Sequence, residues 1–340
     1  MSELRPTLER FRELAGAPAV VGGTIDQDGT LDLAACGVRR RDRPDDLATT
    51  NDACHIGSCG KSITSALFAR LVEAGEAAWG TPLPDLFDDL SPIDHGWSGS
   101  TIDDLLRCRA GVAPNPPMSQ MKAMFETTEP IADQRTEAAQ RVLQKAPQQP
   151  GKFVYSNLGY IVAGAAIERV AAMSFEDAMR HYVTEPLGMN SFGYGPPPSI
   201  CGHRPRLQLG PLVLGRGRAV DVGGLEGDNP PLFSPAGRFH LRLEDWSKFL
   251  LVFLRDGDGF LAPETIARLT EIPAEDPHAI AMGWGSAGPN GSVAMQGSNT
   301  MWSATVFLKN DTTLASMIVA NDGRTSVLRK QALAAIGLLK

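Results

Sequence analysis

The chain has 340 residues, of which 43% are hydrophobic and 21% are charged, and its formal net charge is -7. This composition is typical of a globular protein large enough for two lobes, and an acidic chain without a Lys/Arg-rich tract argues against nucleic acid as a partner. No apolar run approaches the roughly 18 residues that span a bilayer, and the first residues lack the apolar core of a signal peptide. We therefore expect no membrane association and a cytoplasmic location.

The cysteines argue against both disulfides and a metal site. Their number is odd, their spacing is scattered and no Cys-x-x-Cys pair occurs, which indicates reduced thiols in a cytoplasmic protein. Cys201-Gly202-His203 is the nearest approach to a pair of metal ligands, and it offers too few for zinc. We expect neither a metal nor another cofactor.

The first elements in chain order are two strands and a helix. Ala19–Asp26 and Leu31–Arg39 are rich in small and β-branched residues and flank Asp28-Gly29, a pattern that predicts a hairpin. After Ser58 the apolar residues recur at helical spacing, and Gly75 is a suitable end for that helix.

The middle of the chain is expected to be helical with two long irregular excursions, 113–150 and 196–229. A capping-box pattern at Ser174 predicts the start of one helix, and the first excursion contains another near its end. Leu158–Ala172 is a clear apolar helix, and Thr101–Arg107 is a short helix candidate. The predicted helices are Thr101–Arg107, Thr136–Lys145, Leu158–Ala172 and the one that begins after Ser174.

The last hundred residues return to strands. Helices are predicted at Leu243–Leu254, Pro263–Glu271 and Thr325–Leu339, and strands at Ala281–Gly285, Ser292–Gln296, Ser303–Leu308 and Leu314–Val319. Strands joined by tight turns pair antiparallel, so both ends of the chain are expected to build one sheet. The predicted fold is α/β of the α+β type. Residues 1–65 and 240–340 form an antiparallel sheet flanked by helices, 66–239 form an inserted, mainly helical domain, and the site lies in the cleft between them.

The first chemical signal is a Ser-x-x-Lys pattern, which occurs at Ser58–Lys61 and again at Ser119–Lys122. On a helix the Lys61 amine lies one turn from the Ser58 hydroxyl, and a desolvated lysine can accept the proton of a serine nucleophile. Ser58 begins an amphipathic helix, whereas Ser119 lies among prolines and methionines, so the context favours Ser58. The simpler interpretation is a serine that caps a helix beside a solvated lysine.

Two other interpretations of the same stretch are weaker. Gly60-Lys61-Ser62 is the tail of a phosphate-binding loop, but that motif requires a glycine where this chain has His55. Cys59 is a rival nucleophile with His55 as its base, yet adjacent helical residues point about 100° apart, so Cys59 and Ser58 cannot face one site. A buried structural cysteine is the favoured role for Cys59.

The second signal is Tyr155-Ser156-Asn157, which follows a Pro-Gly turn and precedes an apolar helix. A phenol beside a cationic lysine has a lowered pKa and can act as a general base, and Asn157 could donate to a substrate carbonyl. The alternative is a core tyrosine and an asparagine that caps the helix.

Together these motifs resemble those of the serine β-lactamase and penicillin-binding-protein superfamily, most closely the class C β-lactamase-like branch that includes esterases. The resemblance covers nearly the whole chain, and the segments that carry it are 55–75, 101–112, 150–164, 186–189, 235–237 and 296–302. It implies a β-lactamase/transpeptidase-like fold with Ser58 as the acylated nucleophile and Lys61 as its proton acceptor. It also implies that Tyr155 is a base for acylation or for the deacylating water and that Asn157 positions the substrate. The backbone N–H groups of Ser58 and Ser298 would form the oxyanion hole.

The third motif departs from the family pattern, because Met295-Gln296-Gly297 has a methionine where relatives carry lysine or histidine. A thioether cannot anchor an anion, and Gln296 points to the other face of a strand unless the register shifts by one. Gln296, Gly297 and Ser298 remain the candidates for substrate binding there. We expect a serine hydrolase that forms an acyl-enzyme with a carboxylic ester or small amide. The alternative is a catalytically weakened homologue that binds a ligand or partner without efficient turnover.

Overall fold

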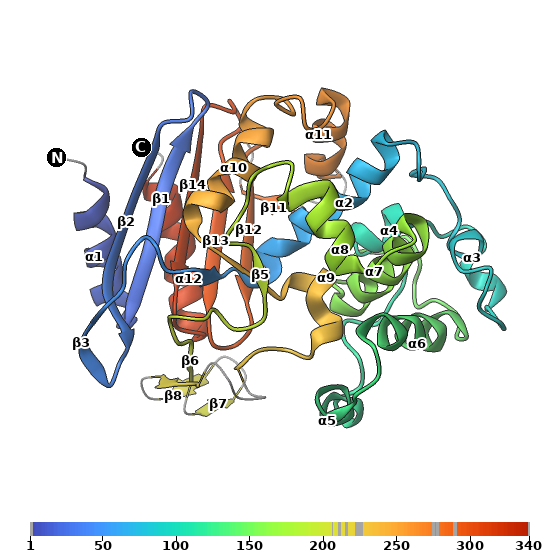
Figure 1. Ribbon diagram of the computed structural model, residues 1–340, viewed down its shortest axis with the longest axis horizontal. Coiled ribbons are helices and arrows are strands. Elements are labelled where there is room, and N and C mark those ends of the chain that lie inside the picture. The colour runs from blue at the N-terminus through green and yellow to red at the C-terminus, as the bar shows by residue number, and fades with distance from the viewer. Residues whose placement is uncertain are drawn as a thin grey trace.

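The computed structural model describes residues 3–205, 207–209, 212–214, 217–221, 227–273, 276, 279–287 and 291–338. Within these residues the main sheet has seven antiparallel strands in the order β11-β12-β13-β14-β1-β2-β3 (Figure 1). The strands are β1 (Ala19–Asp26), β2 (Leu31–Arg40), β3 (Arg43–Leu47), β11 (Gly285–Ser286), β12 (Val293–Ser298), β13 (Ser303–Leu308) and β14 (Leu314–Ala320). The predicted antiparallel sheet flanked by helices is confirmed.

The centre of the sheet joins the two ends of the chain, since Val20 of β1 pairs with Ala320 of β14 on one side and with Cys36 of β2 on the other. These three side chains are buried with α1 (Leu4–Ala15) and α12 (Thr325–Gly337) on one face. Alternate residues of the same strands are buried on the other face, where α10 (Leu243–Leu254) packs. This alternation follows from the two-residue period of a strand.

The other helices lie beside the sheet (Figure 1). Their buried residues form the larger hydrophobic core together with α10 and the face of the sheet that it covers. Every residue of α7 from Leu158 to Ile167 is buried, as expected for a helix that is apolar all round. These helices are α2 (Gly60–Glu73), α3 (Leu83–Leu86), α4 (Ile102–Leu106), α5 (Met118–Glu126), α6 (Ile131–Leu143), α7 (Asn157–Ala171), α8 (Phe175–Met179), α9 (Ser234–Gly237) and α11 (Pro263–Thr270). The division at residues 65 and 240 stays a prediction, and α2 crosses the first of those positions.

Short strands connect the helices to the sheet, and β4–β10–β5 is a small antiparallel sheet of its own. These strands are β4 (Cys54–His55), β5 (Gly193–Tyr194), β6 (His203–Arg204), β7 (Leu207–Leu209), β8 (Leu212–Leu214), β9 (Arg218–Ala219) and β10 (Phe239–Leu241). Part of the predicted excursion 196–229 lies outside the described residues.

Two predictions of secondary structure are corrected. The excursion 113–150 contains two helices, α5 and α6, where one was expected, and α6 begins five residues before the predicted start. Each follows a proline, which fixes φ just before a helix starts. The run 281–285 is a turn with only its last residue in β11, because Gly283 has φ +85°.

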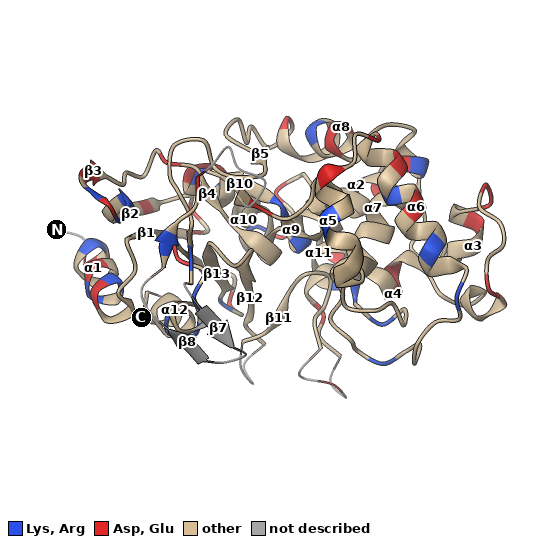
Figure 2. Ribbon diagram, turned by 90° about the horizontal axis from the view of Figure 1, so that it is seen from below, with Lys and Arg blue, Asp and Glu red and all other residues tan. Residues whose placement is uncertain are grey.

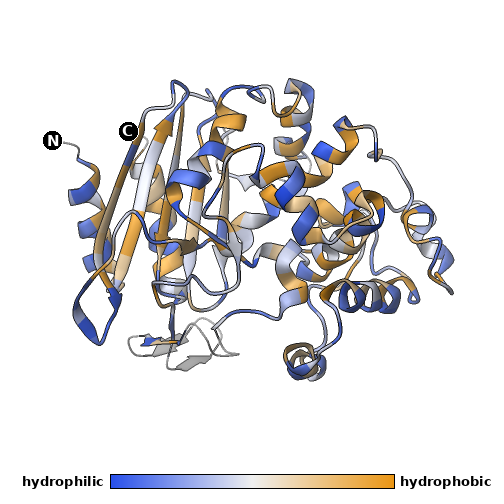
Figure 3. Ribbon diagram, in the orientation of Figure 1, coloured by the Kyte–Doolittle hydropathy of each residue, from blue (hydrophilic) through white to orange (hydrophobic). Residues whose placement is uncertain are grey.

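Charged and apolar residues are distributed as expected for this arrangement. Figure 2 shows Lys and Arg interspersed with Asp and Glu along the helices, and Figure 3 shows a hydrophilic β2–β3 turn beside the apolar β1. No single helix in the described part of the chain is long and apolar enough to cross a membrane. The pair 157–171 and 175–184, bent by 77°, meets that criterion by length and composition only when taken together.

Candidate active site

A sharp turn after β4 presents Ser58 to the edge of β12. Gly57 has φ +52°, and a Cβ at this position would lie 2.5 Å from the backbone N of Ser298, so only glycine fits. Ser58 follows in a 3-10 turn, η1 (Gly57–Cys59), which runs directly into α2. The turn therefore places the Ser58 hydroxyl at the start of a helix, as predicted.

Lys61 lies one turn further along and is fully buried. Its Nζ is 3.2 Å from Ser58 Oγ and donates to Asn157 Oδ1 at 2.7 Å and to the backbone carbonyl of Ala236. Burial lowers the pKa of Lys61 from 10.5 to about 7, because desolvation disfavours the ammonium form.

These contacts fix the direction of the lone pair of a neutral amine. A neutral lysine has two N–H groups and one lone pair, and Asn157 Oδ1 and the Ala236 carbonyl can accept both N–H groups. The lone pair then faces Ser58 Oγ and can accept its proton.

Tyr155 lies beside the same pair of residues. Its ring centroid is 5.0 Å from Lys61 Nζ, and the Ser58 side chain acts to lower the pKa of its phenol. Burial nevertheless raises the pKa of Tyr155 well above its usual value, so the expected lowering of that pKa is wrong. The phenol is protonated at neutral pH, which makes Tyr155 a proton donor or relay there.

Asn157 is held between Lys61 and a residue that the sequence motifs did not indicate. Its Oδ1 accepts from Lys61, and its Nδ2 donates to Asn115 Oδ1 at 2.8 Å. Ser156, not Asn157, caps α7, since the Ser156 hydroxyl accepts from the backbone N of Gly159. Asn157 is therefore free of the capping role and belongs to the site.

The third-motif strand packs its backbone directly against the Ser58 turn. A Cβ on Gly297 would lie 2.1 Å from the carbonyl O of Ile56 and 2.7 Å from the backbone N of Ser58. Because a Cβ on Gly57 would also reach the N of Ser298, the backbone N–H groups of residues 58 and 298 lie close together. Two neighbouring backbone N–H groups are one requirement of an oxyanion hole.

The side chains of the third motif point elsewhere. Gln296 Nε2 donates to the carbonyl of Leu328 on α12 at 2.9 Å, which corrects the prediction that this side chain contacts substrate. Ser298 Oγ donates to the carbonyl of Trp302, so this residue contributes its backbone alone. Met295 is only 7% exposed and lies in the main core.

Comparisons with known proteins show the family and the fold of the chain. The sequence model of the family described as Beta-lactamase matches residues 7–339. The chain belongs to the beta-lactamase family. Its relatives include the unguisins hydrolase ungD' of Aspergillus campestris, which is 25% identical over 83% of this chain and 53% of its own length. The chain thus spans about half the length of that curated relative.

Solved structures of the beta-lactamase fold resemble the chain over 98% of its length. An octameric penicillin-binding protein homologue from Pyrococcus abyssi has a TM-score of 0.76 at 20% identity, with 77% of its chain covered. A class C beta-lactamase from Rhodobacter sphaeroides has a TM-score of 0.73 at 17% identity, with 98% of its chain covered. At these identities the likeness establishes the fold.

The rival residues of this beta-lactamase-family chain are placed away from the chemistry. Cys59 is fully buried, its Sγ donates to the Met295 carbonyl at 3.4 Å, and burial raises its pKa. Ser119 and Lys122 lie on the surface of α5, where Lys122 pairs with Glu126. No group of three possible metal ligands occurs among the residues that the structure describes.

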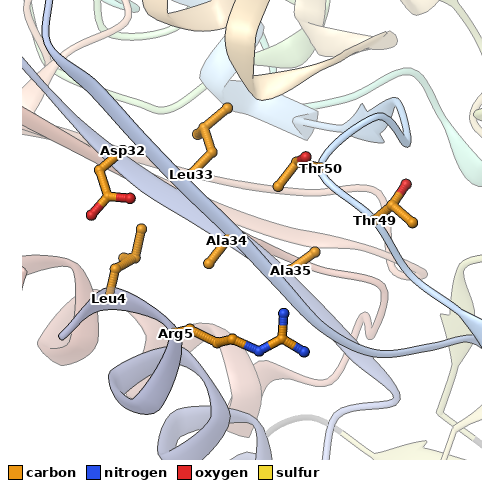
Figure 4. Close-up of a pocket in the computed structure, with 8 residues that line it drawn as sticks. All are labelled: Leu4, Arg5, Asp32, Leu33, Ala34, Ala35, Thr49 and Thr50. Carbon is orange, nitrogen blue, oxygen red and sulfur yellow. The ribbon is translucent and has the colours of Figure 1, made fainter. Parts of the chain in front are cut away.

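The structure has a groove that reaches Asn115 and a separate cavity beside β2. A groove of about 1000 Å³ between α5 and α6 begins at Asn115 and is lined by residues that include Ala123, Met124 and Arg141. A smaller cavity of about 350 Å³ lies between α1 and β2, where Leu4, Arg5 and Asp32 are among its lining residues (Figure 4). The groove and the site share Asn115, which lines the groove and accepts a hydrogen bond from Asn157.

Proposed function

We propose that this protein is a serine hydrolase that forms an acyl-enzyme on Ser58 with a carboxylic ester or a small amide. The observation that supports it best is the buried Lys61 amine, 3.2 Å from Ser58 Oγ, with a pKa of about 7. Two fixed acceptors hold its N–H groups, so the amine is ready to receive the serine proton.

The first half of the reaction acylates the serine. Ser58 Oγ attacks the substrate carbonyl carbon while its proton passes to Lys61, and the N–H groups of Ser58 and Ser298 hold the negative oxygen. The proton then returns from Lys61 through the Tyr155 phenol to the leaving alcohol or amine as its bond to the carbonyl carbon breaks. In the second half, water attacks the carbonyl carbon of the ester on Ser58 and gives a proton to the same pair of residues. The bond between that carbon and Ser58 Oγ then breaks, the proton passes to Oγ, and the carboxylic acid leaves with the free serine restored.

The groove between α5 and α6 suggests the kind of substrate. Its volume of about 1000 Å³ exceeds that of a small acetyl ester, and Ala123, Met124 and Val142 provide apolar lining next to polar groups such as Asn115. We place the larger part of the substrate in this groove. The third motif offers methionine in place of a cation, which favours neutral esters and amides over β-lactams with a free carboxylate.

A ligand-binding protein without efficient turnover is the second candidate, and Met295 is the observation that favours it. The arrangement of Ser58, Lys61, Tyr155 and Asn157 favours an enzyme. Burial of a lysine lowers the stability of the fold, and a catalytic role would explain why this chain has one. Reaction with an activated acyl donor separates the two.

The test is covalent labelling. The protein is treated with a fluorophosphonate and with p-nitrophenyl acetate, and its intact mass is measured. We expect one adduct on the wild type and on Ser119→Ala, the matched control from the second Ser-x-x-Lys pattern, and none on Ser58→Ala. An adduct that persists in Ser58→Ala contradicts the proposed nucleophile. Faster turnover of a chromogenic cephalosporin than of p-nitrophenyl acetate contradicts the preference for esters.

A further inference from the structure

A buried polar network lies behind the two turns that form the oxyanion hole. His55 is fully buried, its Nδ1 accepts from the backbone N of Gly57 at 3.0 Å, and its Nε2 is 2.8 Å from Asp228 Oδ2. Because Nδ1 accepts a hydrogen bond, the ring proton is on Nε2 and is donated to the carboxylate. His55 therefore ties the Ser58 turn to Asp228.

Asp228 connects that turn to a second segment. Its Oδ1 accepts from Asn299 Nδ2 at 2.9 Å and from the backbone N of Asn229, and Arg238 lies 3.7 Å from its Oδ2. Burial alone would raise the pKa of Asp228, but His55, Asn299 and Arg238 outweigh it and hold that pKa below its usual value. The carboxylate is thus ionised and accepts from both sides.

Asn299 completes the connection at the end of β12. Its Oδ1 accepts from the backbone N of Met301 at 3.1 Å and of Trp302 at 3.0 Å, so its side chain shapes the turn that follows Ser298. Asn299 is 3% exposed and cannot touch a substrate. His55 lies two positions before Gly57, and Asn299 directly follows Ser298. Asp228 connects these two residues.

We propose that His55, Asp228 and Asn299 are positioning residues that fix the relative placement of the Ser58 and Ser298 N–H groups and thereby set the rate of acylation. The inference rests on the proposed function. The other contacts between the two turns that the structure describes include the close packing of Gly57 and Gly297 and the weak Cys59 Sγ bond to the Met295 carbonyl. Desolvation of buried polar groups costs stability, so their presence calls for a reason. Here three such side chains lie together between the Ser58 turn and the Ser298 turn.

The test reverses the polarity of one link. Asp228→Asn puts an amide N–H where Asn299 or His55 already donates, and Asn299→Asp places two carboxylates face to face, so each single variant breaks a link of the network. In the double variant Asp228→Asn/Asn299→Asp, the amide at 228 donates to the carboxylate at 299, while the backbone N of Asn229 loses its acceptor. That carboxylate still accepts from Met301 and Trp302, and His55 still finds an oxygen.

The readouts separate positioning from folding. Stopped-flow acylation by p-nitrophenyl acetate gives the acylation rate and the substrate dissociation constant, and infrared difference spectra give the carbonyl stretch of the acyl-enzyme. We expect the acylation rate of each single variant to fall about ten-fold or more, since loss of one oxyanion-hole donor costs roughly 100- to 1000-fold. The dissociation constant should stay within about two-fold, and the carbonyl band should move to higher wavenumber because its hydrogen bonds weaken. The double variant should recover most of both, since it restores the link to residue 299 but not the bond from the backbone N of Asn229.

The controls make each outcome decisive. Asp245→Asn breaks another buried aspartate network, at the start of α10, and should leave rate and band unchanged. If a single variant does not fold, His55→Gln tests the other end of the network, the link of His55 to Asp228 and Gly57, with the same expected shift. A wild-type rate and band in a folded single variant, or a double variant no better than its parents, overturns the inference while the proposed function stands. A wild type that forms no acyl-enzyme overturns both.

Discussion

Replacement of Lys61 by methionine should remove a pH dependence of stability that the buried amine imposes. Burial lowers the pKa of Lys61 from 10.5 to about 7. Between these values the unfolded chain binds a proton that the folded protein does not, so the stability of the wild type rises with pH. The slope approaches 1.4 kcal/mol per pH unit, which is about 2 kcal/mol from pH 7 to pH 9 because the amine is half protonated at the lower limit.

Lys61→Met removes the titrating group and keeps the length of the side chain. The carbonyl oxygens of Asn157 and Ala236 lose a donor, which shifts the stability of the variant by a constant amount at every pH. Urea unfolding followed by tryptophan fluorescence at pH 7, 8 and 9 measures both proteins. From pH 7 to pH 9 the free energy of unfolding of the wild type should increase by about 2 kcal/mol more than that of the variant. Ser58→Ala, which keeps the lysine, should follow the wild type, and parallel curves for wild type and Lys61→Met would refute the reasoning.

Three further outcomes are expected. For the wild type, kcat/KM should rise with pH through a midpoint near 7, because only the neutral Lys61 amine accepts the serine proton, and a flat profile from pH 6 to pH 8 would contradict that role. Gly297→Ala puts a Cβ 2.1 Å from the Ile56 carbonyl and should lower kcat by about 100-fold or more, whereas Gly80→Ala, which meets nothing within 4 Å, should have wild-type activity. Ala123→Phe, which narrows the groove, should reduce hydrolysis of long-chain p-nitrophenyl esters and spare the acetate, and equal losses on both would place the substrate elsewhere.

The elements that could be predicted from the sequence are those in which the apolar residues are also the buried ones. The strand Ser303–Leu308 and the helix Leu243–Leu254 have the predicted ends, since each packs a regular face into the core. The helix α5 buries none of its residues, so its sequence carries little periodicity to read. The apolar run 281–285 is buried because Gly283 packs against the backbone of Ser62, and its burial does not come from strand pairing.

The same limit separates what was predictable in the site from what was not. Ser58 and Lys61 meet because they are three positions apart at the start of a helix, and this spacing can be read directly from the sequence. The direction of the Tyr155 pKa depends on how deeply the phenol is buried, which requires the packed structure. The His55–Asp228 link joins residues 173 positions apart, and no local pattern encodes it.

The pairing of β1 with β14 also determines when the protein can fold during its synthesis. β1 ends at Asp26 and its central partner β14 begins at Leu314. At the usual rate of 5–20 residues per second, the ribosome needs roughly 15 to 60 s to make the intervening chain. Throughout that time the inner edge of the β1–β2 hairpin exposes unpaired backbone groups, which is the kind of edge that aggregates. We expect the nascent chain to depend on a chaperone that covers this edge until β14 emerges.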